Sequence, residues 1–282
     1  MGYRRAVNDY LDVNRANWDE RAPAHAASDD YNFAAFAADP QHISDVIAFD
    51  RPLLGDITGL RAVHLQCHIG TDTVSLSRLG ATMTGLDFSA NSLAEARRLA
   101  TLAKADIEFV ESDLYGAPDV LENAAFDLVF TGIGAIGWLP DIRRWAKVVA
   151  TLLRPGGRLF IREGHPVLWG LQDGREDDVL ALEFDYFEHK DPLVWDEGGT
   201  YVATEHEFVN TVTHSWNHGM GEIVTALLDA GMTITGLVEH DTVPWLALPG
   251  KMTKVANGEW QVTDRPRRLP HSYTLQAVRN AV

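Results

Sequence analysis

The amino-acid sequence predicts an α/β fold whose sheet is mostly parallel. Two observations carry this prediction: short apolar runs alternate with helix-like segments between residues 61 and 163, and the connections between them are short. A parallel strand pair needs a long crossover, usually a helix, and such helices cover both faces of the sheet. The alternation stops after Glu163, so we expect the rest of the chain to be built differently.

Five strands and their helices are expected in the alternating region. Each strand is a short run of apolar residues, and each helix combines an apolar face with a polar or small residue at its start. The strands are expected at 61–66, 82–86, 106–110, 126–131 and 158–162, with helices at 71–79, 90–103 and 141–153.

The flanking segments are expected to complete a seven-stranded, Rossmann-like sheet. Residues 1–58 should form an N-terminal helical cap, and residues 59–282 one α/β domain. Residues 165–218 lack a helical period, so we expect a β-rich insertion after strand five that acts as a lid. Helices are expected at 9–22, with Leu11, Asn14 and Trp18 on one face, and at 39–54 and 219–230; strands at 232–240 and 273–279 should pair antiparallel at the sheet edge, joined by a loop at 241–270.

The composition of the 282 residues narrows the class of protein. No apolar run approaches the roughly 20 residues that span a bilayer, and the N-terminus has no apolar signal core, so we expect neither a membrane partner nor export. The formal charge of −16 argues against nucleic-acid binding. Cys67 is the single cysteine, which fits a cytoplasmic setting. We expect no metal, and a homodimer is the default expectation.

Residues 61–89 predict a site for an adenosine-containing ligand. A strand leads into a turn ending at Gly70, and a second strand ends at Asp87. In such a unit the turn brings backbone N–H groups to the ligand, and the acid accepts hydrogen bonds from ribose hydroxyls. Both a nicotinamide cofactor and a phosphate-free adenosyl compound stay open. Gln66 and His68 favour the second, because pyrophosphate needs bare backbone where their side chains stand.

The order of these pieces resembles the class I S-adenosylmethionine-dependent methyltransferases, over 61–163 and again at 219–280. In that family strand one usually ends D/E-x-G-x-G-x-G. Here the stretch is His64-Leu65-Gln66-Cys67-His68-Ile69-Gly70, which keeps the last glycine alone. The strings LQCHIGTDT and TGLDFS are similar to a bacterial subgroup with His at the middle glycine position. The turn Leu153–Leu159 before strand five also fits the family.

The resemblance implies a cofactor site for S-adenosyl-L-methionine. Asp87 would bind the ribose, and Phe88 would pack on the adenine ring. Ser112, Asp113 and Leu114 would read the adenine amino group, and Thr131, Gly132 and Ile133 would lie under the methionine part. Gln66, Cys67, His68 and Gly70 form the turn.

Several of these residues have a second interpretation. Asp72 could replace the acid missing at His64, or be a helix N-terminal acid favoured by the dipole. His68 could contact the ligand carboxylate or fill the turn. Cys67 could be a small buried side chain. Trp18 and His25 could cover the cofactor or belong to the core; Tyr10 and Tyr31 are weaker candidates of the same kind.

The methyl acceptor is expected to be a small aromatic or partly apolar metabolite, in secondary metabolism. Enzymes that methylate nucleobase amino groups resemble one another by an Asn/Asp-Pro-Pro-Tyr/Phe string after strand four, and this segment lacks that string. The candidate general bases are His165 and His218, although a histidine before a proline is also a common structural residue. Candidate acceptor contacts are Trp138, His165, Trp169, Trp195, Trp216 and, less strongly, His214; the tryptophans could equally belong to the core.

The sequence therefore supports one main hypothesis and two alternatives. The main hypothesis is methyl transfer to a small molecule by in-line displacement, in which alignment and exclusion of water matter more than any single catalytic group. The alternatives are a nicotinamide-dependent oxidoreductase and a non-catalytic subunit that binds the cofactor or serves in assembly.

Overall fold

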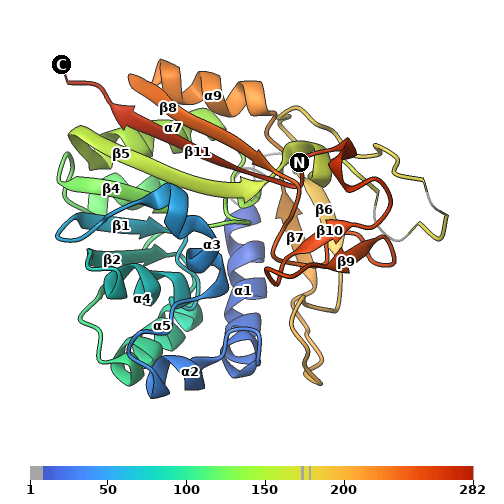
Figure 1. Ribbon diagram of the computed structural model, residues 1–282, viewed down its shortest axis with the longest axis horizontal. Coiled ribbons are helices and arrows are strands. Elements are labelled where there is room, and N and C mark those ends of the chain that lie inside the picture. The colour runs from blue at the N-terminus through green and yellow to red at the C-terminus, as the bar shows by residue number, and fades with distance from the viewer. Residues whose placement is uncertain (1–8, 173–174, 178, 282) are drawn as a thin grey trace, which may run out of the picture.

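A seven-stranded sheet organises the computed structural model, which describes residues 9–172, 175–177 and 179–281 (Figure 1). The prediction for residues 1–8 lies outside these ranges. The strands are β1 (Arg61–Leu65), β2 (Thr82–Asp87), β3 (Glu108–Glu111), β4 (Phe126–Thr131), β5 (Leu153–Gly164), β8 (Met232–His240) and β11 (Ser272–Arg279). Their order is β3-β2-β1-β4-β5-β11-β8.

The sheet has the predicted Rossmann-like, mostly parallel architecture. β3, β2, β1, β4 and β5 pair in parallel. The last two strands form the predicted antiparallel pair at the sheet edge. β11 is the reversed strand, since it also runs antiparallel to β5, and β8 is outermost. The carboxyl ends of the five parallel strands therefore meet along one edge, where α/β proteins bind ligands.

Helices cover both faces of the sheet, as expected. The helices are α1 (Asp9–Ala27), α2 (Phe33–Ala38), α3 (Asp45–Leu54), α4 (Thr71–Arg78), α5 (Ala90–Ala103), α6 (Ala117–Val120), α7 (Ile142–Leu152), α8 (Pro166–Trp169) and α9 (Met220–Asp229). α3 and α4 pack on one face through Ile47, Leu54 and Leu76, and α7 and α9 pack on the other through Trp145 and Leu227. None of the helices within the described ranges is long and apolar enough to cross a membrane.

The N-terminal region and the insertion differ in detail from the prediction. α3 begins at Asp45 rather than near residue 39, because the Ser44 side chain caps it by accepting the N–H of Ile47. The insertion is less β-rich than expected, since its strands in the described ranges are the pair β6 (Leu193–Asp196) and β7 (Val212–Ser215). The loop at 241–270 contains the hairpin β9 (Met252–Lys254) and β10 (Trp260–Val262).

α1 and the strand pair β6–β7 form one cover, which we define as these three elements. α1 crosses the carboxyl ends of the strands, and the insertion lies beyond it (Figure 1). Asn14 exchanges two hydrogen bonds with the backbone of His214, at 2.9 and 2.8 Å. Arg21 donates to the carbonyls of Asn210, Glu197 and Gly199. Two segments far apart in the sequence are thus joined over the same edge.

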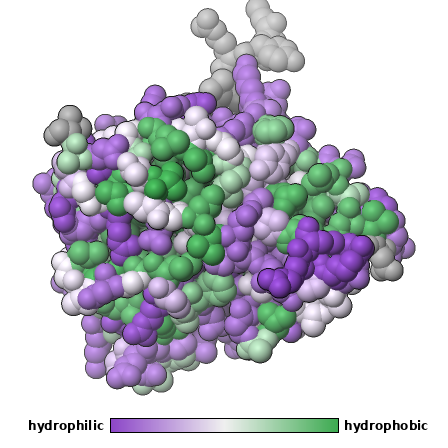
Figure 2. Space-filling view, turned by 45° about the horizontal axis from the view of Figure 1, so that its top comes forward, coloured by the Kyte–Doolittle hydropathy of each residue, from purple (hydrophilic) through white to green (hydrophobic). Residues whose placement is uncertain are grey.

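The outer surface mixes polar and apolar residues. Figure 2 shows both kinds on one face, with apolar residues gathered in its upper left part. Leu237 and Val238 on β8 and Leu228 on α9 are exposed. Apolar atoms contribute more than half of a typical folded surface, so these residues need no special explanation.

A buried ion pair fastens the β9–β10 hairpin to the sheet. Arg162 of β5 is fully buried and donates to both carboxylate oxygens of Glu259, at 2.8 and 2.9 Å. Its guanidinium also lies 3.6 Å from the centroid of the Phe49 ring. Removing one partner of such a pair leaves an uncompensated buried charge.

We therefore expect Glu259→Gln to lower the free energy of unfolding by roughly 3 kcal/mol, because Arg162 loses the carboxylate that accepts two of its hydrogen bonds and keeps only Asp50, whose Oδ1 lies 3.9 Å from Arg162 Nε, as a buried acidic neighbour. Urea unfolding followed by tryptophan fluorescence measures this change. The control is Glu122→Gln, which breaks the exposed pair with Arg61 at 2.8 Å and should change the free energy by less than about 1 kcal/mol. Equal effects of the two substitutions would contradict the assigned role of Arg162.

Candidate functional site

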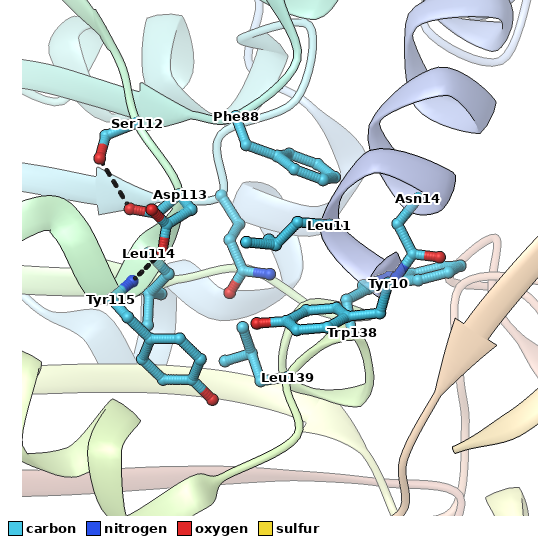
Figure 3. Close-up of a pocket in the computed structure, with 11 residues that line it drawn as sticks. Tyr10, Leu11, Asn14, Phe88, Ser112, Asp113, Leu114, Tyr115, Trp138 and Leu139 are labelled. Carbon is cyan, nitrogen blue, oxygen red and sulfur yellow. Dashed lines mark hydrogen bonds between the residues drawn. The ribbon is translucent and has the colours of Figure 1, made fainter. Parts of the chain in front are cut away.

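A cavity lies at the carboxyl ends of the parallel strands, beneath α1 (Figure 3). Its volume is about 30 Å³. The segments that follow β1, β2, β3 and β4 supply most of its lining, and Leu11 points into it from α1 (Figure 3). The lining residues are Gln66, Phe88, Ser112, Asp113, Leu114, Tyr115, Trp138 and Leu139 from the segments after the strands, with Tyr10, Leu11 and Asn14 from α1.

The turn after β1 keeps the backbone conformation of a glycine-rich turn while carrying side chains. Gln66 and His68 have φ values of 57° and 50°, in the left-handed region that costs a non-glycine residue of order 1 kcal/mol. Gly70 has φ 82°, and a Cβ there would lie 2.8 Å from Cβ of Ala96. The Gln66 side chain donates to the carbonyl of Ala135 at 2.9 Å, which links this turn to the loop after β4.

Asp87 at the end of β2 anchors this turn. Its Oδ2 accepts the backbone N–H of His68 at 2.8 Å, and its Oδ1 accepts that of Ser89 at 2.9 Å. Burial raises the pKa of the Asp87 carboxyl to about 6, although these N–H groups oppose the shift. Cys67 is not among the residues that line the cavity, is buried in a cluster with Phe109, and has a pKa raised well above its ordinary value by burial. It contacts the core, as its second interpretation proposed.

Asp72 brings a carboxylate to the end of β4 from the first turn of α4. Its Oδ1 accepts a hydrogen bond from Ser44 Oγ at 2.6 Å, and its Oδ2 lies 3.7 Å from where a Cβ on Gly132 would stand. Burial raises the pKa of Asp72 to about 6. His64 lies beside it, bonded to Thr73 at 2.9 Å, and burial lowers the pKa of His64 to about 3. The family has an acid where His64 stands on β1, and in this chain Asp72 on the next helix provides a carboxylate beside that position.

The residues after β3 line the opposite end of the cavity. Asp113 Oδ1 accepts the N–H groups of Tyr115 and Gly116, at 2.9 and 3.2 Å, and Ser112 Oγ donates to the Asp113 carbonyl (Figure 3). Phe88 and Leu114 supply apolar surface on the same cavity. Phe88, Ser112, Asp113 and Leu114, which the sequence placed in one site, therefore do meet.

Two buried side-chain atoms near the cavity have no hydrogen-bond partner among the residues that the structure describes. They are Gln66 Oε1 and Thr131 Oγ1, and Thr131 is fully buried at the end of β4. Buried polar atoms are nearly always paired, so unpaired ones call for an explanation. Ile133 stands two residues further on and packs against the cluster that includes Leu168.

Trp18 and His25 of α1 lie over the turn after β1. The Trp18 ring centroid is 5.0 Å from that of His68 and 5.3 Å from that of Trp138. His25 Nδ1 lies 3.3 Å from both His68 Nε2 and the Tyr201 hydroxyl. Burial, helped by Arg21, lowers the pKa of His25 to about 4, so this imidazole is uncharged at neutral pH. Tyr31 and Tyr201 bond through their hydroxyls at 2.5 Å.

The geometry corrects the prediction of His165 as a general base. His165 Nδ1 accepts the N–H of Val167 as the cap of α8, and His165 Nε2 lies 3.0 Å from Glu239 Oε1. Both ring nitrogens are engaged. The reason is local, since Pro166 begins α8 and the preceding side chain folds back on the helix start.

His218 also has both ring nitrogens engaged, so the structure does not offer it as a base. Its Nδ1 lies 2.8 Å from Glu188 Oε2 and its Nε2 lies 3.1 Å from the Ile136 carbonyl. Partial burial raises the pKa of Glu188, but the hydrogen bonds from His218 and from the N–H of Ile142 outweigh it and lower the pKa overall. His218 therefore holds the loop after β4.

The candidate acceptor tryptophans separate into two groups. Trp138 lines the cavity, and Trp216 packs edge-on against Tyr10 with ring centroids 5.3 Å apart. Trp169 stacks on Trp245, and Trp195 packs against Phe184 within the insertion. The last two therefore lie outside the cavity, which corrects their placement. His214 bonds to Asn14 through its backbone.

Sequence reasoning missed part of the lining. Tyr115 and Leu139 gave no signal of their own, and Leu11 and Asn14 were recognised as a helix face but not as cavity residues. Glu163 was also missed. Its carboxylate accepts backbone N–H groups of the loop after β4.

Comparison with known proteins assigns this region to a family. Residues 63–159 match the family model described as a methyltransferase domain. This region of the chain is similar to methyltransferase domains. The match begins within β1 and ends within β5, and it supports the class I resemblance at the level of the family.

Individual relatives of the methyltransferase domain match only in part. The ubiquinone biosynthesis O-methyltransferase of Cronobacter sakazakii is 31% identical over 107 residues, which are 38% of this chain and 43% of the relative. The malonyl-[acyl-carrier protein] O-methyltransferase of Enterobacter lignolyticus is 38% identical over 80 residues, 28% of this chain and 29% of the relative. The chain thus spans less than half the length of these curated relatives.

A solved structure resembles this chain in fold over a longer part of the sequence. An S-adenosylmethionine dependent methyltransferase from Mesorhizobium loti superposes with a TM-score of 0.56 and 22% identity, covering 84% of this chain and 98% of that one. At this identity the likeness concerns the fold alone.

The methyltransferase domain depends on glycine at the turn after β1. We expect Gly70→Ala to lower the free energy of unfolding by about 2–4 kcal/mol, because left-handed strain adds to the contact with Ala96. Gly156→Ala is the matched control: φ there is 76° with nothing within 4 Å of the new Cβ, so strain alone should cost about 1 kcal/mol. Urea unfolding of both variants checks this. A Gly70→Ala effect no larger than the control would contradict the close packing.

Proposed function

We propose that this protein is an S-adenosyl-L-methionine-dependent methyltransferase acting on a small molecule. One observation carries the proposal. In a methyltransferase domain, the Asp87 carboxylate at the end of β2 lies beside a cavity that residues after β1, β3 and β4 line. This is the edge of an α/β sheet where nucleotide-like ligands bind.

The polar atoms of the site fit the proposed cofactor. Gln66 Oε1 and Thr131 Oγ1 are buried acceptors without partners, and Asp72 Oδ2 faces the same region near Gly132. A ligand that carries an ammonium group and hydroxyls would supply the donors that these atoms lack. The side chains of Gln66 and His68 also leave no bare turn for a pyrophosphate, which disfavours a nicotinamide cofactor.

The cofactor would supply a methyl group on a sulfonium sulfur, and the chain's residues would bind it and exclude water. Asp87 would accept hydrogen bonds from the ribose hydroxyls, and Phe88 and Leu114 would pack on the adenine. Asp113 would accept from the adenine amino group. Asp72 would pair with the ammonium group of the methionine part, near Thr131 and Gly132. These roles need alignment rather than a charged catalytic group.

The small cavity supports a moving cover. The cavity volume is about 30 Å³. Cavities that hold cofactor-sized ligands measure about 300–1,000 Å³. Leu11 and its neighbours on α1 would therefore have to withdraw for the cofactor to enter. Trp18 would stay close to the reacting centre, because it packs on both His68 and Trp138.

The proposed acceptor is a small aromatic or partly apolar metabolite. The aromatic rings of Tyr10 and Trp138 line the cavity, and those of Trp216 and Trp18 pack edge-on against them, which supports a site for such a molecule. The relatives named above are O-methyltransferases, which favours an oxygen acceptor. A cytoplasmic setting, a place in secondary metabolism and a homodimer belong to the same proposal.

Isothermal titration calorimetry with S-adenosylhomocysteine tests the proposal. We expect the wild-type protein to bind, and Asp87→Asn to weaken binding at least about tenfold, since a charge-assisted hydrogen bond contributes about 1.5–3 kcal/mol. Asp127→Asn is the control, because Asp127 is a carboxylate near the amino end of β4 that accepts the N–H of Arg61. No heat for the wild type would refute the cofactor. Binding without turnover on any acceptor panel would favour a non-catalytic subunit.

A second ligand isolates the role of Asp72. 5′-Methylthioadenosine carries the adenosine and sulfur but no amino-acid part. We expect Asp72→Asn to weaken S-adenosylhomocysteine about tenfold or more while leaving 5′-methylthioadenosine unchanged, because only the former offers an ammonium group. Asp87→Asn should weaken both ligands. Equal losses for both ligands in Asp72→Asn would show that Asp72 merely supports the fold.

A further inference from the structure

Three backbone N–H groups of the loop after β4 donate to one buried carboxylate, that of Glu163. Glu163 Oε1 accepts the backbone N–H of Gly134 at 2.7 Å, and Oε2 accepts those of Ala135 and Ile136 at 2.8 and 3.0 Å. The N–H of Gly164 donates to Oε1 at 2.6 Å. Three consecutive N–H groups of the loop thus converge on one side chain of the neighbouring strand.

The surroundings of Glu163 suit an ionised carboxylate. The residue is 2% exposed, and the hydrogen bonds that the structure gives its oxygens all come from backbone N–H groups. Burial raises the pKa of Glu163, and these four N–H groups act against that shift. A protonated carboxyl would turn an O–H toward donors, so at least one of these bonds would break.

The carbonyl groups of the same loop are held by other side chains. Gln66 Nε2 donates to the Ala135 carbonyl at 2.9 Å, His218 Nε2 lies 3.1 Å from the Ile136 carbonyl, and Trp138 Nε1 donates to the Gly134 carbonyl at 2.8 Å. These bonds fix the position of the loop relative to the turn after β1 and to Trp138, which lines the cavity. Glu163 fixes the backbone N–H groups of the same loop.

We propose that Glu163 is a positioning residue for the cofactor site. It acts through the loop 134–136, which it fixes so that Gln66 and Trp138 take their places at the cavity, and it does not itself line the cavity. The inference rests on the proposed function, because the ligand that reports the position of the loop is the proposed cofactor.

The test uses Glu163→Gln, which keeps the size of the side chain but removes the charge and turns an amide NH₂ toward backbone donors. Calorimetry with S-adenosylhomocysteine should show an affinity loss of roughly tenfold to a hundredfold, as expected for charge-assisted hydrogen bonds. The control is Asp127→Asn, a carboxylate that also accepts a backbone N–H, that of Arg61 at 2.8 Å. Its affinity should equal that of the wild type.

A spectroscopic signature separates positioning from general stability. In ¹⁵N-resolved spectra the amide protons of Gly134, Ala135 and Ile136 should lie downfield in the wild type and move upfield together in Glu163→Gln. Wild-type affinity in both Glu163→Gln and the control would overturn the inference while leaving the proposed function intact. Failure of the wild type to bind would refute the proposed function instead.

If Glu163→Gln does not fold, a pH titration of the wild type decides. The three amide protons should move upfield with one common midpoint as pH falls, and the affinity for S-adenosylhomocysteine should decrease over the same range. The common midpoint should be the same in Asp72→Asn and Asp87→Asn, whose carboxyls also titrate in the wild type with pKa values raised to about 6. Amide protons that move while the affinity stays constant would overturn the inference, as would amide protons that do not share a midpoint.

Discussion

The site depends on the hydrogen bonds that Asp87 accepts from backbone N–H groups. By holding the N–H groups of His68 and Ser89, this carboxylate fixes the end of β2, the turn after β1 and the start of α5 relative to one another. Asp113 and Glu163 hold the segments after β3 and β4 in the same way. Charge-assisted bonds to backbone donors are stronger than neutral ones. Three loops are thereby ordered by carboxylates that accept backbone N–H groups.

Much of this arrangement could be predicted from the sequence, because it follows from local patterns and one topological rule. Apolar runs gave the strands, and the carboxyl ends of parallel strands must meet at one edge, so Asp87, Phe88 and Asp113 could be brought together in advance. Gln66 was harder. Its place in a turn usually made of glycine was visible, but its hydrogen bond to Ala135 depends on a loop more than sixty residues away along the chain.

The remaining errors concern contacts that no local pattern encodes. Pro166 signalled a helix start, so His165 as its cap was within reach, whereas the pairing of His165 with Glu239 was not. The same holds for His218, whose two partners come from the insertion and from the loop after β4. Trp169 and Trp195 were chosen for their residue type, yet their neighbours are other aromatic rings of long-range segments. Composition identifies aromatic residues but not which of them face a cavity.

The joining of α1 to the insertion has a consequence for protein engineering. Asn14 and Arg21 are matched to particular backbone carbonyls of residues 197–214, so each segment carries half of one interface. Grafting a different insertion onto this chain would leave the amide group of Asn14 and the guanidinium group of Arg21 without these acceptors. A chimera with a different insertion must therefore exchange both segments at once, although α1 precedes residues 63–159 in the sequence and the insertion follows them.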